Sequence, residues 1–287
     1  MANEDLVLFE KRGRVAVITI NRPDARNAQN GKLIYQLDDA YYRFAQDDDL
    51  AVAVLRGEGK SFSAGHDIGK GSDRGVSFPR RSLWWDHSDK QGVDNRFARE
   101  QELYLGLTRR WRELPKPTIA MVHGACIAGG LMLAWSCDFV VASPDAFFSD
   151  PVVAVGLPGM EYFIHPHIMG SRRAKEFLFT GRRVYADEAK EFGMVNHVYP
   201  LDELEERTME LAETIARMPR LGLALAKQAV NRFEDAMGLD IAIDSVFGLH
   251  QLGHSHNAET QGNPIHGLNT NAILDVMNGA DSSRREQ

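Results

Sequence analysis

Residues 116–138 read KPTIAMVHGACIAGGLMLAWSCD, and this stretch decides the fold. The apolar run at 118–122 is typical of a buried strand, and Gly129 and Gly130 lead directly into an apolar helix. A strand, a glycine turn and a helix direct unpaired backbone N–H groups and the positive end of the helix dipole at one point. The pattern favours the binding of a negatively charged oxygen, although the same glycines would also permit close helix–strand packing.

A second turn of the same kind comes earlier in the chain. The apolar run at 51–55 is followed by FSAGHDI at residues 62–68, in which small residues precede a polar one. Two successive strand–helix units can each offer one backbone N–H group to the same oxygen, and a pair of converging donors is what an oxyanion hole requires. The two turns together therefore predict such a site.

The rest of the chain alternates strands and helices at first and is helical later. Residues 14–20 alternate as a strand does, residues 29–46 place their apolar side chains on one helical face, and 138–142 form another buried strand. Helical patterns dominate from residue 201. We predict an α/β core at 1–200, a helical region at 201–256, and a loosely ordered tail at 257–287 with a short helix near 272–277.

Residues 69–98 are polar, and Leu83-Trp84-Trp85 interrupts them. One interpretation is a mobile segment that covers a site, with Trp84 and Trp85 as apolar walls; the other is a surface loop that its tryptophans anchor. We expect a helix to follow at 99–114.

Composition limits the possible classes of protein. The 287 residues are 44% apolar and 25% charged, and their formal net charge of −7 argues against a nucleic-acid partner. No apolar run is long enough to span a bilayer, and the acidic N-terminus has no signal-peptide core. Cys126 and Cys137 lie in apolar segments, so we interpret them as buried free thiols rather than nucleophiles. We expect a cytoplasmic protein without a membrane partner.

Two groups of residues raise the question of a metal. The run Asp47-Asp48-Asp49 is interpreted as a solvated loop. His250, His254 and His256 lie at helical spacing; one interpretation is a metal site, but we expect an exposed cluster or a subunit interface there. We therefore predict no metal site.

The ordered landmarks resemble the crotonase superfamily, the enoyl-CoA hydratase/isomerase family, over roughly residues 7–256. The resemblance rests on the two glycine turns and on further motifs in the same order. These motifs are Asn21-Arg22-Pro23, Ala25-Arg26-Asn27-Ala28, Lys116-Pro117, Cys137-Asp138, Gly156-Leu157-Pro158-Gly159, Phe179-Thr180-Gly181, Gly193-Met194-Val195 and Ala226-Lys227.

The resemblance implies a spiral of ββα units, a C-terminal helical trimerisation region, and a homotrimer or a dimer of trimers. It implies an acyl-CoA thioester as ligand and no separate cofactor, because coenzyme A is part of the substrate. The oxyanion hole of the family maps onto the N–H groups of His66 and Gly129. The coenzyme A contacts map, largely through the backbone, onto Asp24, Ala25, Arg26, Ala28, Ala64, Asp67 and Ile68.

The sequence departs from the family at the acid–base positions. The two glutamates of typical hydratases fall on Met132 and Val152, which transfer no proton. Asp150 and Glu161 are the nearby substitutes, since an apolar pocket would raise the pKa of either carboxyl. Asp150 would otherwise be a loop cap or a salt-bridge partner, and Glu161 a charge at a helix N-terminus.

His66 adds a further alternative. Its Gly-His-Asp turn resembles that of crotonase-fold methylmalonyl-CoA decarboxylases, although we expect its side chain to pack outward. The predicted function is thioester-enolate chemistry of the enoyl-CoA hydratase/isomerase type, a lyase activity of fatty acid metabolism. The alternatives are an isomerase, a decarboxylase, a non-catalytic acyl-CoA-binding protein and a structural trimeric scaffold.

Overall fold

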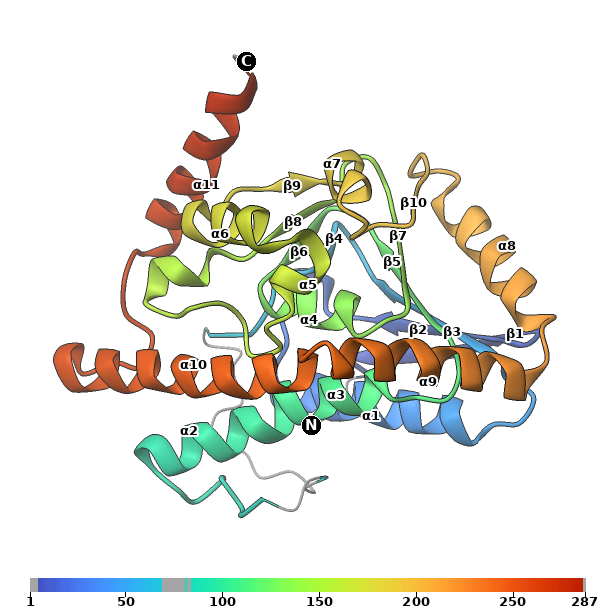
Figure 1. The fold of residues 1–287 in the computed structure, drawn as a ribbon, viewed down its shortest axis with the longest axis horizontal. Coiled ribbons are helices and arrows are strands. Elements are labelled where there is room, and N and C mark those ends of the chain that lie inside the picture. Colours follow the sequence, from blue (N-terminus) through green and yellow to red (C-terminus); the bar gives the residue numbers. More distant parts are fainter. Residues whose placement is uncertain (1–4, 69–80, 82–83, 286–287) are drawn as a thin grey trace.

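Two β-sheets form the framework of the computed structural model, which describes residues 5–68, 81 and 84–285 (Figure 1). The larger sheet contains, in spatial order, β1 (Val7–Arg12), β2 (Val15–Ile20), β3 (Val52–Gly57), β5 (Thr118–Val122), β7 (Phe139–Ala142) and β10 (His197–Val198). The smaller sheet contains, in spatial order, β4 (Ser61–Ser63), β6 (Ala125–Ile127), β8 (Phe147–Ser149) and β9 (Val184–Tyr185).

Successive passes of the chain place one strand in each sheet. β3 is followed by β4, β5 by β6, and β7 by β8, and the neighbouring strands of successive passes are parallel. Helices connect one pass to the next. This arrangement is the predicted spiral of ββα units, and it brings the ends of β4 and β6, with the turns that follow them, side by side.

The larger sheet is covered on both faces. Alternate residues of β3 point to opposite sides, as in any strand: Val52 and Val54 pack in a cluster with Leu204, whereas Leu55 belongs to the main core with Leu33. The helices responsible are α1 (Gly31–Gln46), whose N-terminus is capped by the Asn30 side chain, and α8 (Leu204–Ala216).

A continuous helical segment follows the residues 69–80 and 82–83, which lie outside the described part of the chain. It consists of α2 (Gly92–Glu100), a π-helical turn η2 (Gln101–Gly106) and α3 (Leu107–Arg112). The helix therefore begins at Gly92, whereas the sequence predicted a start at residue 99, because the first turns are polar and show no apolar face. Single π-helical turns are rare and often lie at functional sites.

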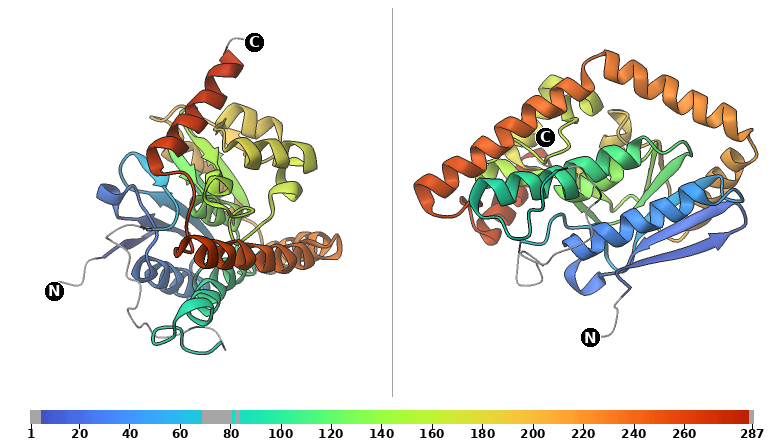
Figure 2. Two further views of the ribbon diagram at one scale, coloured as in Figure 1. Left: turned by 90° about the vertical axis from the view of Figure 1, so that its left-hand side faces the viewer. Right: turned by 90° about the horizontal axis from the view of Figure 1, so that it is seen from below.

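Long helices complete the chain. α9 (Arg220–Ala236) and α10 (Leu239–Gln261) run end to end along one side of the molecule (Figures 1 and 2), and α11 (Thr270–Arg285) is longer than the predicted short helix. The remaining elements are η1 (Pro23–Ala25), α4 (Gly129–Trp135), η3 (Pro151–Val155), α5 (His165–Met169), α6 (Ser171–Thr180) and α7 (Ala186–Glu191). Within the described residues, no helix combines the length and the apolar character needed to cross a membrane.

An ion pair fixes α9 to the larger sheet. The Asp138 Oδ2 atom lies 2.9 Å from Lys227 Nζ and also accepts a hydrogen bond of 2.8 Å from the Thr118 N–H group. The Lys227 side chain is only 6% exposed, and that of Asp138 is 22% exposed.

Replacing this carboxylate tests its contribution. We expect Asp138→Ala to lower the free energy of unfolding by about 2 kcal/mol, because it leaves a nearly buried ammonium group without its partner while some solvent still reaches the site. Urea unfolding measures the change. The matched control is Asp145→Ala, at an exposed aspartate that follows β7, and it should change the free energy of unfolding by less than about 0.5 kcal/mol. Equal losses of stability in the two variants would refute the assignment.

Candidate active site

The turns that follow β4 and β6 lie in direct contact. Gly65 has a φ angle of +91°, and a Cβ atom built on it would lie 2.7 Å from the Ile127 carbonyl oxygen and 3.2 Å from the Gly129 nitrogen. Any side chain at Gly65 would therefore push the two turns apart. The sequence predicted that these turns belong to one site, and the fold places them together.

Each of the two turns leaves one backbone donor unpaired. Ala128 has φ 46° and ψ −113°, and this unusual conformation starts α4 so that the Gly129 N–H group begins the helix. In the described part of the chain, neither the His66 N–H nor the Gly129 N–H group has a hydrogen-bond acceptor. Both residues line a cavity of about 560 Å³.

The loop after β2 pairs with the turn after β4. The Gln29 N–H group donates to the Gly65 carbonyl oxygen, and the Asp67 N–H group donates to the Gln29 carbonyl oxygen, both at 2.8 Å. The Arg22 guanidinium group lies 2.6 Å from Asp67 Oδ2. Of the seven residues expected to contact coenzyme A, Ala64, Asp67 and Ile68 line the cavity, whereas Asp24, Ala25, Arg26 and Ala28 lie in this adjoining loop.

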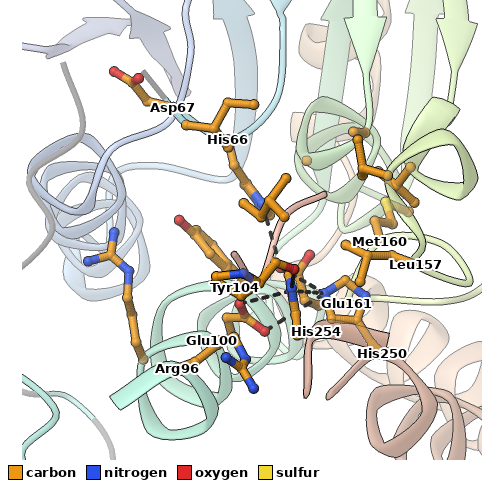
Figure 3. Close-up of a pocket in the computed structure, with 18 of the residues that line it drawn as sticks. His66, Asp67, Arg96, Glu100, Tyr104, Leu157, Met160, Glu161, His250 and His254 are labelled. Atoms are coloured by element: carbon orange, nitrogen blue, oxygen red, sulfur yellow. Dashed lines mark hydrogen bonds and ion pairs between the residues drawn. The ribbon is translucent and has the colours of Figure 1, made fainter. Parts of the chain in front are cut away.

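The cavity wall also receives side chains from α2, η2 and α10 (Figure 3). Arg96, Glu100 and Tyr104 line it together with His250 and His254, and Glu100 lies in contact with both histidines. Trp84 and Trp85 are exposed and are not among the lining residues. The interpretation of these tryptophans as cavity walls is therefore wrong, and the part of that prediction concerning residues 69–80 and 82–83 lies outside the described chain.

Glu161 is a buried carboxyl group that lines the cavity. Its side chain is 4% exposed, and its Oε1 atom lies 3.6 Å from His66 Nδ1 and 3.7 Å from His250 Nε2 (Figure 3). Burial, and next the nearby charge of Glu100, raises the pKa of Glu161 well above its ordinary value. Glu161 precedes α5 by several residues, so it does not serve as a charge at that helix N-terminus.

Asp150 lies behind the cavity wall. Its Oδ2 atom accepts a hydrogen bond of 3.0 Å from the Met160 N–H group and lies 2.9 Å from His165 Nε2, and both side chains of the pair are fully buried. Asp150 is not among the residues that line the cavity. Its contacts match the salt-bridge alternative, and they fix the backbone next to Glu161.

The side chain of His66 points into the site, so the expectation that it packs outward is wrong. The imidazole stacks on the Tyr104 ring, with centroids 3.6 Å apart and planes inclined by 12°. Gly129 makes this possible, because a Cβ atom there would lie 2.5 Å from the imidazole. Burial lowers the pKa of His66 to about 3, so the ring is neutral at pH 7. Its Nε2 atom has no hydrogen-bond partner within the described residues.

The positions of the missing glutamates are apolar in space as well. Val152 lines the cavity, and Met132 is buried in the core. Cys126 and Cys137 are free thiols that lie outside the cavity lining. Burial raises the pKa of Cys137 to about 12 and that of Cys126 well above its ordinary value, so neither thiol is a ready nucleophile.

Sequence reasoning missed Glu100 and Tyr104 and misplaced two histidines. His250 and His254 are buried and line the cavity, so the expectation of an exposed cluster is wrong for them, whereas His256 is exposed. The i, i+4 spacing of His250 and His254 can be read from the sequence. Their contact with Glu100 could not be predicted, because α10 lies about 150 residues from Glu100 and local patterns do not report contacts over that separation. Glu100, His250 and His254 are also the residues here that could hold a metal ion.

Comparisons with known proteins agree with this architecture. A family model described as enoyl-CoA hydratase/isomerase matches residues 10–245. EchA13 of Mycobacterium tuberculosis, named among the enoyl-CoA hydratases, is 43% identical over 88% of this chain and 81% of its own length. A short-chain-enoyl-CoA hydratase of Clostridium acetobutylicum is 34% identical over 89% of this chain and 91% of its own.

Solved structures show the same fold. A probable enoyl-CoA hydratase from Mycobacterium thermoresistibile superposes with a TM-score of 0.83 at 45% identity, covering 91% of this chain and 100% of that one. The chain therefore belongs to the enoyl-CoA hydratase/isomerase family of the crotonase superfamily.

Proposed function

We propose that this protein processes enoyl-CoA thioesters by stabilising a thioester enolate between the N–H groups of His66 and Gly129. The proposal is supported by the position of His66 and Gly129 on one cavity and by the lack of an acceptor for either N–H group among the described residues. Hydrogen bonds to the carbonyl oxygen of a bound thioester strengthen as negative charge develops on it, so they lower the barrier to enolate formation.

In this proposal, one set of residues binds the coenzyme A part of the ligand and another set lines the path of the acyl chain. The loop containing Asp24, Ala25, Arg26 and Ala28, together with Ala64, Asp67 and Ile68, would hold coenzyme A largely through backbone groups. The hydrogen bonds between these two segments, and the Arg22–Asp67 ion pair, keep them adjacent. The acyl chain would then extend past His66 into the cavity between Tyr104 and Leu157.

Glu161 is the acid–base residue of the proposal. In hydration, its carboxylate takes a proton from water as the water oxygen bonds to Cβ, and the resulting carboxylic acid returns a proton to Cα of the enolate. A raised pKa suits both halves of this exchange. Asp150 positions Glu161 through the Met160 backbone and takes no part in proton transfer.

Isomerisation of the double bond is the second candidate. Val152 and Met132 supply no second acid–base group, and a single carboxylate is sufficient to remove a proton from one carbon and return it to another. The relatives named enoyl-CoA hydratases favour hydration. Neither route requires a separate cofactor, because coenzyme A enters with the substrate.

We further propose a homotrimeric assembly through α9 and α10. Phe233 of α9 is 66% exposed, Ile241 of α10 is 73% exposed, and Leu225 and Leu249 are also largely exposed. Large apolar side chains in such number on two consecutive helices are typical of a contact surface between subunits. We expect further copies of the same chain to cover this surface, because the family resemblance implies a trimerisation region here.

The role of Glu161 is tested with crotonyl-CoA. We expect Glu161→Gln to lower the rate at which the enoyl-thioester absorbance band is lost by about a hundredfold or more, because the amide cannot transfer the proton, while thioester binding is retained. Glu191→Gln, at an exposed glutamate of α7, is the matched control. Asp150→Asn should keep turnover within about tenfold; loss of turnover in Asp150→Asn but not in Glu161→Gln would contradict the assignment.

The fit between Gly129 and His66 is tested by a double-mutant cycle. We expect Gly129→Ala to lower kcat by about a hundredfold, because its Cβ atom displaces the imidazole and moves the two donors apart. Adding His66→Ala to Gly129→Ala removes the clash and should recover at least about tenfold of that loss. Strictly additive effects of the two substitutions would show that the clash is not the cause.

The assembly is tested by light scattering after size-exclusion chromatography. We expect the wild-type chain to elute as a trimer or hexamer, and the double variant Phe233→Glu/Ile241→Glu to dissociate, because charges are costly in an apolar interface. Leu201→Glu, at an exposed leucine outside the two helices, should assemble normally. A monomeric wild-type chain would refute the proposal.

A further inference from the structure

Glu100, His250 and His254 bring three potential metal ligands together in the cavity wall (Figure 3). One atom of each lies within 4.8 Å of the others, and all three residues are buried. Glu100 comes from the C-terminal end of α2, whereas the histidines are one turn apart on α10. The fold therefore joins a carboxylate and two imidazoles from distant parts of the chain.

The hydrogen bonds of the two histidines fix which ring nitrogen carries the proton. His250 Nδ1 lies 2.8 Å from the Gly159 carbonyl oxygen, and His254 Nδ1 lies 2.7 Å from the Pro264 carbonyl oxygen. A carbonyl oxygen only accepts hydrogen bonds, so both Nδ1 atoms must donate. In the neutral rings, each Nε2 atom then presents a lone pair to the site.

These lone pairs face one another. The two Nε2 atoms are 3.1 Å apart, and Glu100 Oε1 lies 3.3 Å from His254 Nε2. Glu100 Oε2 lies 3.8 Å from His250 Nε2. Acceptor atoms of all three residues thus lie close together, and their mutual repulsion in a buried site is offset when a positive charge lies between them.

The spacing matches the coordination shell of a metal ion. Tetrahedral zinc, with bonds of about 2.0–2.1 Å to nitrogen and oxygen, holds its ligand atoms about 3.3 Å apart. The two Nε2 atoms, 3.1 Å apart, and Glu100 Oε1, 3.3 Å from His254 Nε2, lie close to that separation, and the other carboxylate oxygen, Oε2, lies 3.8 Å from His250 Nε2. Two imidazoles and one carboxylate also form a donor set that zinc uses when its fourth position is open.

The surrounding contacts support the three ligands from outside. The backbone carbonyl oxygens of Gly159 and Pro264 orient the imidazoles, and the Gln251 side-chain amide donates a hydrogen bond to Glu100 Oε2. Outer contacts of this kind fix ring orientation and increase ligand basicity at metal centres.

We propose that Glu100, His250 and His254 form a binding site for a divalent transition-metal ion of the zinc class. The three residues line the cavity together with Glu161, whose Oε1 atom lies 3.7 Å from His250 Nε2. The site differs from the sequence-based expectation of no metal, and it goes beyond the proposed thioester chemistry, which does not require it.

Metal binding to the tag-free full-length protein tests this site directly. After treatment with a chelator and dialysis, calorimetric titration with Zn²⁺ should give one ion per chain with a Kd at or below the micromolar range. Co²⁺ should produce the visible absorption bands of a tetrahedral site. Glu100→Gln and His254→Ala should each weaken binding about a hundredfold, whereas His256→Ala, at an exposed histidine of the same helix, should leave it unchanged.

Several results would overturn the proposal. Absence of stoichiometric binding to the wild-type protein would refute the site. Binding that survives in Glu100→Gln and His254→Ala but is lost in His256→Ala would place the ion elsewhere. Glu100→Gln preserves the side-chain shape, so it remains informative if His254→Ala unfolds. None of these readouts involves a thioester, so a failure here is distinguishable from a failure of the proposed function.

Discussion

The absence of a side chain at Gly65 is the constraint on which the site depends. A Cβ atom at this position would lie 2.7 Å from the Ile127 carbonyl oxygen, so only glycine allows the turns after β4 and β6 to touch. That contact places His66 and Gly129 on the same cavity. The parallel arrangement of β4 and β6 in the smaller sheet brings the turns together, and Gly65 permits the final approach.

A second close approach determines what lines the cavity. Because Gly129 also lacks a side chain, the His66 imidazole lies over the start of α4 and stacks on Tyr104 of the π-helical turn. The same helical segment carries Glu100 toward α10. The two glycines therefore bring His66 and Gly129 close to a buried polar cluster that Glu100 forms with two histidines from the distant helix α10.

The two glycine turns and the alternation of strands and helices were predictable because they follow from local patterns, whereas the spiral arrangement was an implication of the family resemblance. Alternating strands, short glycine turns and apolar helices are visible within windows of a few residues. The direction of the His66 side chain was not predictable in this way, because it depends on the space left by Gly129 in another turn. The burial of His250 and His254 depends likewise on the packing of α10 against α2. This packing could not be predicted from the local spacing of apolar residues.

The central claim is that two backbone N–H groups polarise the carbonyl group of a bound thioester. Isotope-edited infrared difference spectroscopy of butyryl-CoA labelled with ¹³C at the carbonyl tests it directly, because this saturated thioester can bind without being hydrated. The account predicts a carbonyl stretch at lower frequency in the complex than in water, with the shift reduced in Gly129→Ala. A bound thioester whose carbonyl stretch remains at its solution frequency would contradict the account.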